Sequence, residues 1–212
     1  MNRNKKDVAI RKQEILETAL KLFITKGYEK TTTNDIMKAI NISRGGLYHH
    51  FASKEEILDS AITSLLISEK SRVKSIIDDE KLSAVDKLKI IIGFDSSSQP
   101  MVGDIKTLVE EKENPTLITH LLKKKLEIIT PLFVDIIEQG INEGLFICKY
   151  PEQFSKISVI LSTLLFTDTL IHMSYEEYEK MIKAFQIIIE AMLGVETGAF
   201  NFISDYISKD KW

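Results

Sequence analysis

Hydrophobic residues recur at steps of three and four along most of this 212-residue chain. That spacing places them on one face of an α-helix. Strand-like alternation followed by a hairpin dipeptide does not occur, since neither Asn-Gly nor Asp-Gly is present. The pattern therefore predicts an all-α protein.

Three short helices are predicted within the first 55 residues. The first runs from about Val8 to Lys26, and Gly27 stands where a glycine commonly ends a helix. The second begins in TTTNDI, where Thr32 is the expected N-cap and Asp35 completes a capping box. Ser43 is expected to cap the third helix, RGGLYHHF.

The second and third helices are joined by a tight turn. Asn41 is expected to adopt the left-handed backbone conformation there, because Asn is the commonest substitute for Gly in that role. A helix pair with such a turn is a helix-turn-helix unit. Ser53, with Glu56 three residues later, predicts the start of a long fourth helix that runs to about Asp78.

The remaining chain is predicted to be helical as well, with a short final helix left open after residue 194. The expected helices span residues 83–95, 102–111, 115–140, 151–172 and 175–193. The last two are apolar on more than one face, which calls for partners on two sides. Pairing with a second copy of the chain in a four-helix bundle and burial within one chain both meet that need.

Charge is divided unevenly along the chain. Residues 1–54 contain eleven bases and five acids, a net charge of +6, whereas the remainder contains 17 bases and 26 acids, a net charge of −9. Phosphate backbones attract a basic segment, and an acidic body repels them. Chance variation in surface charge explains the same division equally well.

Composition excludes several classes of protein. A single cysteine, Cys148, allows neither an intrachain disulfide nor a cysteine-based zinc site. The basic N-terminus has no apolar run behind it, and polar residues interrupt the apolar stretch 157–170, so the expected location is the cytoplasm. Adjacent His49 and His50 point about 100° apart on a helix, and no metal site is expected.

An enzyme is not expected, and neither is a cofactor. Cys148, Asp168 and His172 form an imaginable catalytic set, but Asp and His four residues apart are ordinary on a helix surface. No glycine-rich nucleophile elbow is present.

The segment ILETALKLFITKGYEKTTTNDIMKAINISRGGLYHHFASKEEIL resembles the DNA-binding domain of TetR-family transcriptional regulators. The resemblance covers roughly residues 10–60. It implies a helix-turn-helix DNA-binding domain over residues 1–54 and a larger α-helical ligand-binding and dimerisation domain over residues 55–212. The chain departs from the family's usual pattern in two places, with Asn41 where Gly is common and Gly46 where Thr, Ser or Ala is common.

The third helix is the expected reader of DNA bases. Its N-terminal residues would face base edges in the major groove, and Arg44 can donate two hydrogen bonds to guanine. Tyr48, His49 and the threonines of the second helix are expected at phosphates, and the resemblance adds Lys54. The expected DNA-binding residues are Thr32, Thr33, Ser43, Arg44, Gly45, Gly46, Tyr48, His49 and Lys54. Lys5, Lys6, Arg11 and Lys12 are candidates for further phosphate contacts.

The resemblance also implies a small-molecule pocket in the body of the chain and a homodimer formed through residues 151–193. The candidate pocket residues are Phe94, Met101, Leu108, His120, Phe133, Ile137, Phe166 and Thr167. Apolar residues at helical spacing belong more often to a core than to a pocket. The expected function is a repressor that binds a palindromic operator and responds to a small hydrophobic effector. The alternative is an activator, or a regulator controlled by a protein partner.

Overall fold

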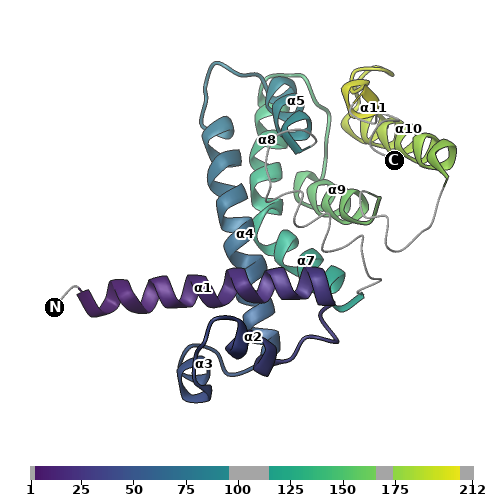
Figure 1. Cartoon of the computed structure of the whole chain (residues 1–212). Helices are drawn as coiled ribbons and strands as arrows, with labels where there is room; N and C mark the ends of the chain where they lie inside the picture. Colours follow the sequence, from purple (N-terminus) through teal and green to yellow (C-terminus); the bar gives the residue numbers. More distant parts are fainter. Residues whose placement is uncertain (1–2, 96–114, 166–173, 206–212) are drawn as a thin grey trace.

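A computed structural model describes residues 3–95, 115–165 and 174–205 of the chain. Its regular structure in those ranges is entirely α-helical, as predicted (Figure 1). The helices are α1 (Arg3–Lys26), α2 (Thr33–Ala39), α3 (Arg44–His50), α4 (Lys54–Ile77), α5 (Ala84–Asp95), α7 (Pro115–Ile128), α8 (Thr130–Asn142), α9 (Pro151–Leu165), α10 (Tyr175–Leu193) and α11 (Phe202–Asp205). The helix predicted over residues 102–111 lies outside the described residues.

The predicted N-caps of α2 and α3 and the predicted turn between these helices are confirmed. The Thr32 hydroxyl accepts the Asp35 amide at 3.1 Å, and the Asp35 carboxylate accepts the Thr32 amide at 2.8 Å. Ser43 accepts the Gly46 amide, also at 3.1 Å. Asn41 has φ of 52°, the only positive value outside glycine among the residues that the structure describes. These local interactions fix where α2 and α3 begin and how the chain turns between them.

At the start of α4, the expected capping box is only partly formed. Ser53 accepts the Glu56 amide at 3.1 Å, as predicted. The Glu56 carboxylate, however, accepts the amide of Ala52 rather than that of Ser53.

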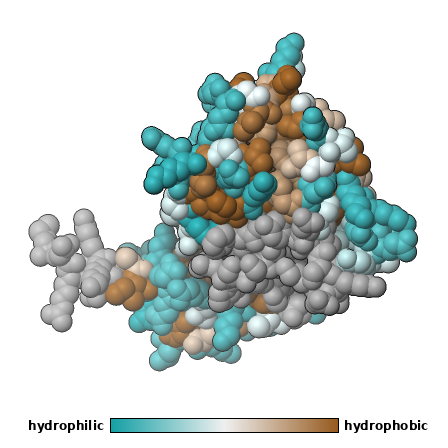
Figure 2. All heavy atoms as spheres, turned by 90° about the horizontal axis from the view of Figure 1, so that it is seen from above, coloured by the Kyte–Doolittle hydropathy of each residue, from teal (hydrophilic) through white to brown (hydrophobic). Residues whose placement is uncertain are grey.

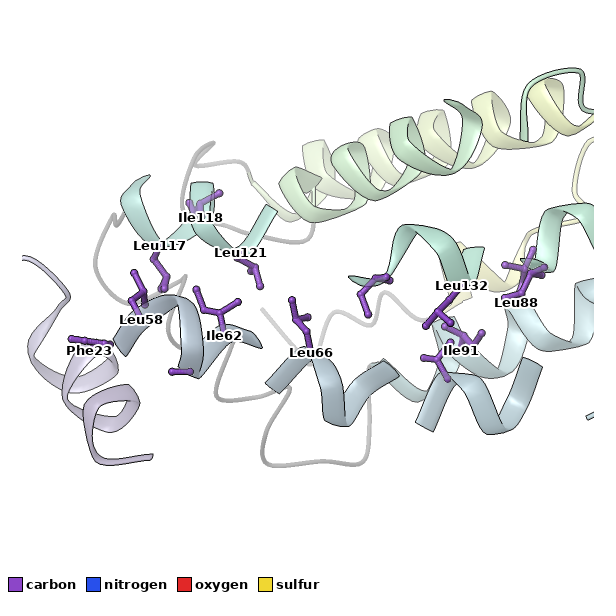
Figure 3. Packing of buried hydrophobic residues seen from close by; sticks show 14 of the residues in the cluster. Phe23, Leu58, Ile62, Leu66, Leu88, Ile91, Leu117, Ile118, Leu121 and Leu132 are labelled. Atoms are coloured by element: carbon purple, nitrogen blue, oxygen red, sulfur yellow. The ribbon is translucent and has the colours of Figure 1, made fainter. Parts of the chain in front are cut away.

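The hydrophobic core continues from α1 through α4 into the body. Figure 3 shows Phe23 of α1, Leu58 and Ile62 of α4, and Leu117 and Leu121 of α7 along one side of α4. All five side chains are buried. Because α4 shares this core with α1 at one end and with α7 and α8 beyond, it positions the helix-turn-helix against the rest of the molecule.

The prediction of one continuous helix over residues 115–140 was wrong. The structure has two helices, α7 and α8, which meet at Ile129 with Pro131 in the first turn of α8. Proline lacks an amide hydrogen, and its ring collides with the carbonyl four residues earlier, so an uninterrupted helix is disfavoured there. The same residue is well suited to a helix's first turn.

A buried lysine holds the C-terminal end of α4. Lys87 of α5 is 3% exposed, and its ammonium donates to the carbonyl of Ile77 and, at 2.7 Å, to the side chain of Gln139 on α8. An ammonium at a helix C-terminus is favoured by the helix dipole. The contact ties the ends of three helices together.

The C-terminal segment is held in a similar way by a buried acid. Glu190 of α10 is 2% exposed, and its carboxylate accepts the amides of Gly198 and Phe200 at 3.0 and 2.9 Å. The short final helix, which the sequence left open, is present as α11. None of the helices in the described ranges is long and apolar enough to cross a membrane.

Candidate nucleic-acid interface

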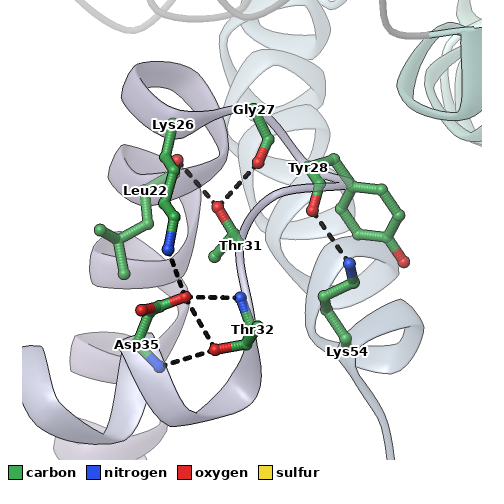
Figure 4. Close-up of polar contacts among 8 residues, drawn as sticks. All are labelled: Leu22, Lys26, Gly27, Tyr28, Thr31, Thr32, Asp35 and Lys54. Atoms are coloured by element: carbon green, nitrogen blue, oxygen red, sulfur yellow. Dashed lines mark hydrogen bonds and ion pairs between the residues drawn. The ribbon is translucent and has the colours of Figure 1, made fainter.

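The turn between α1 and α2 is built around Thr31, Thr32 and Asp35 (Figure 4). The Thr31 hydroxyl is buried and donates to the carbonyl of Gly27 at 2.8 Å. The ammonium of Lys26 contacts the Asp35 carboxylate at 2.6 Å. This contact, together with hydrogen bonds from the amide and hydroxyl of Thr32, holds the pKa of Asp35 well below its usual value. The side chain of Asp35 is therefore ionised in the folded protein at neutral pH.

The two threonine candidates differ in what their hydroxyls do. Thr32 donates its hydroxyl proton to Asp35 at 2.7 Å, so that proton is committed within the turn. The Thr33 hydroxyl lies 3.5 Å from that of Tyr48 on α3. Thr33 and Tyr48 are thus brought together at the surface between α2 and α3, whereas Thr32 stabilises the start of α2.

The outer face of α3 is exposed and carries hydrogen-bond donors. Leu47 is fully buried beneath it, while Ser43, Arg44, Tyr48 and His49 are exposed. The guanidinium of Arg44 lies 5.6 Å from the centroid of the Tyr48 ring. Stacking on a ring directs a guanidinium without using its N–H groups, which leaves them available for acceptors on a ligand.

An open groove of about 560 Å³ separates this face of α3 from α2. It is lined by Thr33, Asn34, Met37, Lys38, Asn41, Ile42, Arg44 and Tyr48. Asn34 and Lys38 were not predicted from the sequence as candidates for binding. Their spacing of four residues on α2 was the available signal, because it places both on one face of the helix.

The two glycines of α3 have different surroundings. A Cβ atom built on Gly45 would meet nothing within 4 Å, so this position is open backbone on the outer face. A Cβ on Gly46 would lie 2.7 Å from Cγ1 of Ile42. Gly46 is therefore a packing position, and the glycine allows α3 to approach the turn.

The two adjacent histidines of α3 differ in burial, since His49 is exposed and His50 is not. His50 is partly buried beside Phe51, with ring centroids 6.5 Å apart. Burial lowers the pKa of His50, and the nearby positive charges of His49, Lys12 and Arg11 lower it further. Within the ranges that the structure describes, no three His, Cys, Asp or Glu side chains gather as metal ligands.

Lys54 packs against the turn between α1 and α2. Its ammonium donates to the carbonyl of Tyr28 at 2.9 Å and lies 4.1 Å from the centroid of the Tyr28 ring (Figure 4). Burial raises the pKa of Tyr28 to about 12, and the negative charges of Glu55, Glu29 and Asp59 act in the same direction. Lys54 thus fixes the start of α4 to the helix-turn-helix through one of its three donors.

The predicted pocket residues are described only in part. Ile137 is buried in the core, Phe133 packs partly buried against it, and His120 lies half-buried on α7. The side chain of Phe94 and residues Met101, Leu108, Phe166 and Thr167 lie outside the described residues.

His120 contacts the N-terminal half of α4. Its ring Nδ1 is 2.5 Å from the carboxylate of Asp59 on α4. Nearby, the hydroxyl of Thr116 donates to the carboxylate of Glu29, which precedes α2, at 3.3 Å. These two contacts join α7 directly to the N-terminal part of the chain.

The helices α9 and α10 leave apolar side chains on the surface. On α10, Met181, Ile188 and Met192 are exposed at spacings of seven and four residues, which places them on one face. Ile157 on α9 is exposed as well. Figure 2 shows the molecule from above, where apolar residues, in brown, lie exposed among polar ones.

Comparison with known proteins agrees with the architecture. The family model for bacterial regulatory proteins of the tetR family matches residues 15–61, and the model for the tetracyclin repressor-like C-terminal domain matches residues 103–188. The transcriptional repressor KstR2 of Mycobacterium tuberculosis is 30% identical over 152 residues, which are 69% of this chain and 74% of KstR2. The negative transcriptional regulator IcaR of Staphylococcus aureus is 43% identical over 51 residues, 24% of this chain and 27% of IcaR.

Solved structures show the same fold. The fatty acid degradation regulator FadR of Bacillus halodurans superposes with a TM-score of 0.62 at 16% identity, over 74% of this chain and 82% of FadR. The reduced form of Escherichia coli NemR gives a TM-score of 0.60 at 14% identity, over 87% of this chain and 95% of NemR. The family consists of transcriptional regulators rather than enzymes. With a capped helix-turn-helix on an all-helical body and a match to KstR2 across most of both proteins, this chain belongs to the TetR family of DNA-binding transcriptional regulators.

Proposed function

We propose that this regulator is a repressor that binds a palindromic operator as a homodimer and is released by a small hydrophobic effector. The observation that carries the proposal is the exposed face of α3, where Arg44 lies over the Tyr48 ring and both side chains line an open groove. KstR2 is a transcriptional repressor and IcaR is a negative transcriptional regulator, which supports repression over activation.

In this proposal, residues 1–54 read DNA. Arg44 contacts a guanine, and the bare backbone at Gly45 allows α3 to approach the base edges closely. Tyr48, His49 and Thr33 donate to phosphates on either side of the groove. Ser43 and Thr32 hold the two helix ends in place, Gly46 keeps α3 close to the turn, and Lys54 offers its remaining donors to a phosphate.

Residues 55–212 would form the dimer and the effector site. A two-fold operator requires a two-fold protein, and the exposed apolar face of α10 provides a surface that a second copy would cover. The surface continues into the loop before α9, where Ile147 is 78% exposed while its amide donates to the carbonyl of Leu193. An exposed isoleucine on a backbone held in this way is well placed for a contact between copies.

The dimer is tested by sedimentation equilibrium with Ile188→Glu on the exposed face of α10. Lys180→Glu on the charged N-terminal part of the same helix is the matched control. We expect a dimer for the unmodified protein and the control, and a monomer for Ile188→Glu. A stable monomer of the unmodified protein at micromolar concentration would rule out the dimer.

Base reading is tested by fluorescence anisotropy on an operator obtained by in vitro selection. Arg44→Ala should lose about 1–3 kcal/mol of operator affinity and relax the preference at one base pair in each half-site. Lys54→Ala should weaken binding to operator DNA and to random DNA by the same factor. If Arg44→Ala weakened operator and random DNA equally, Arg44 would not be a base-reading residue.

The effector is tested by screening small apolar compounds for a rise in melting temperature, and then for release of operator DNA. A compound at about 100 times its dissociation constant adds about 2.7 kcal/mol of stability. Because coupling between sites is reciprocal, operator DNA must weaken binding of a true effector by the same factor. A tight ligand whose calorimetric affinity is identical with and without operator is not an effector.

A further inference from the structure

The helix α1 continues beyond the part of the protein that packs around it. Ile15 is the first buried residue from residue 8 onward, where burial is described, and residues 8–14 are all exposed. Figure 1 shows the N-terminal half of α1 extending past α2 and α3, away from the body. A helix segment that buries no face gains little stability from the fold. The fold alone therefore gives no reason for this extension.

The extended segment is basic. Residues 3–14 contain five bases, Arg3, Lys5, Lys6, Arg11 and Lys12, against two acids, Asp7 and Glu14. Arg11 is paired with Glu14 at 2.7 Å. The net charge of +3 on about three helical turns makes the segment attractive to a polyanion.

The inner end of this segment lies beside α3. The ammonium of Lys12 is 5.3 Å from the centroid of the Phe51 ring, and Phe51 is the residue at which α3 ends. The pKa of the neighbouring His50 is lowered by burial and then by charges that include Lys12 and Arg11. The basic half of α1 therefore begins next to the C-terminal end of α3.

We infer that residues 3–14 of α1 form a second DNA-binding element, which contacts backbone phosphates outside the base pairs that α3 reads. The inference rests on the proposed function of α3. From Lys12 to Arg3 is nine residues, or about 13 Å along a helix at about 1.5 Å per residue. At about 3.4 Å per base pair, the segment spans about four base pairs beyond the end of α3. The element recognises phosphate charge and not sequence.

The length of the flanking DNA separates this element from the helix-turn-helix. The full-length protein is titrated with the selected palindrome, either trimmed at its ends or extended by six base pairs of arbitrary sequence on each side. The test variant is Lys5→Gln/Lys6→Gln. The control is Lys74→Ala/Lys81→Ala, which removes the same charge from two exposed positions, one in the last turn of α4 and one in the loop that follows it. Melting temperatures show whether each variant is folded.

We expect the unmodified protein and the control to bind the extended duplex more tightly and with a steeper salt dependence than the trimmed one. Each phosphate contact contributes about 0.9 to the slope of log affinity against log salt. Two lysines in each half of a dimer then flatten the slope by about 2 to 4 in the test variant, on the extended duplex only. On the trimmed duplex, all three proteins should bind alike.

The failure of this inference differs from the failure of the proposed function. If the unmodified protein bound both duplexes with one affinity and one slope, the second element would not exist, while operator binding by α3 would stand. The same conclusion would follow if the test variant kept its preference for the extended duplex. If the folded protein bound no selected DNA at all, the proposed function itself would fall.

Discussion

The neighbouring glycines of α3 offer a paired test of how the recognition helix is built. Each Gly→Ala substitution gains up to about 1 kcal/mol of helix stability. At Gly45 the new methyl group meets nothing within 4 Å, so no clash offsets this gain, and we expect a rise of up to about 2–4 °C in melting temperature for a chain of this size. At Gly46 the methyl carbon would lie 2.7 Å from Cγ1 of Ile42 and 3.1 Å from its Cδ1. Such overpacking costs about 1–3 kcal/mol, which leaves a net loss of about 0–2 kcal/mol.

Differential scanning calorimetry measures the two stabilities, and fluorescence anisotropy measures the two operator affinities. Gly45→Ala should be more stable than the unmodified protein and yet bind operator more weakly, because its methyl group stands where α3 meets the bases. If Gly46→Ala raised the melting temperature as much as Gly45→Ala, a methyl group at residue 46 would not be overpacked against Ile42. Unchanged operator affinity for Gly45→Ala would show that α3 does not approach the DNA closely at this residue.

Three further predictions concern the turn, the capping box and the C-terminal segment. Asn41→Gly should melt like the unmodified protein, whereas Asn41→Val should lose at least about 1 kcal/mol, because a β-branched residue is strained at a positive φ; equal melting temperatures would contradict this. The pKa of Asp35 is lowered by folding, so the stability that it contributes is complete above its usual value of 3.8 and is lost as the pH falls below that value. The stability of Asp35→Asn should therefore fall less steeply in acid than that of the unmodified protein. If the stability of both proteins fell equally with pH, Asp35 would not contribute in this way. Burial alone would raise the pKa of Glu190, but hydrogen bonds from the amides of Phe200 and Gly198 and from Gln186 lower it. Glu190→Ala should cost about 1–3 kcal/mol and speed amide hydrogen exchange at Phe200, because it leaves a buried donor without an acceptor, and unchanged exchange would speak against that role.

The first 55 residues could be predicted closely from the sequence because their signals are local. Thr32 and Asp35 are three residues apart, and Asn41 lies in the turn that it shapes. A side chain that caps a helix acts on amides within one turn, so its type and spacing identify the contact. The exposed candidates on α3 follow from the same helix once its buried residue, Leu47, is known.

The body could be predicted only as a set of helices, because its decisive contacts join residues that are far apart in the chain. The break at Pro131 was missed because apolar residues recur on both sides of it, and a proline in the first turn of a helix leaves that periodicity intact. Candidates for the pocket were chosen by residue type, which does not distinguish a buried side chain such as Ile137 from one that faces a ligand.

The two ends of α4 show what such long-range contacts do. Lys87 joins the C-terminal end of α4 to α8 through Gln139, 52 residues away, and a lysine with this spacing looks like an ordinary surface charge in the sequence. Near the other end, Asp59 contacts His120, 61 residues away. A displacement of α7 would therefore act directly on α4 close to where it leaves the helix-turn-helix, while the far end of α4 stays fixed to α5 and α8. If α4 moves as a rigid body, such a displacement would rotate α4 about its held C-terminal end, and α3 would turn with it.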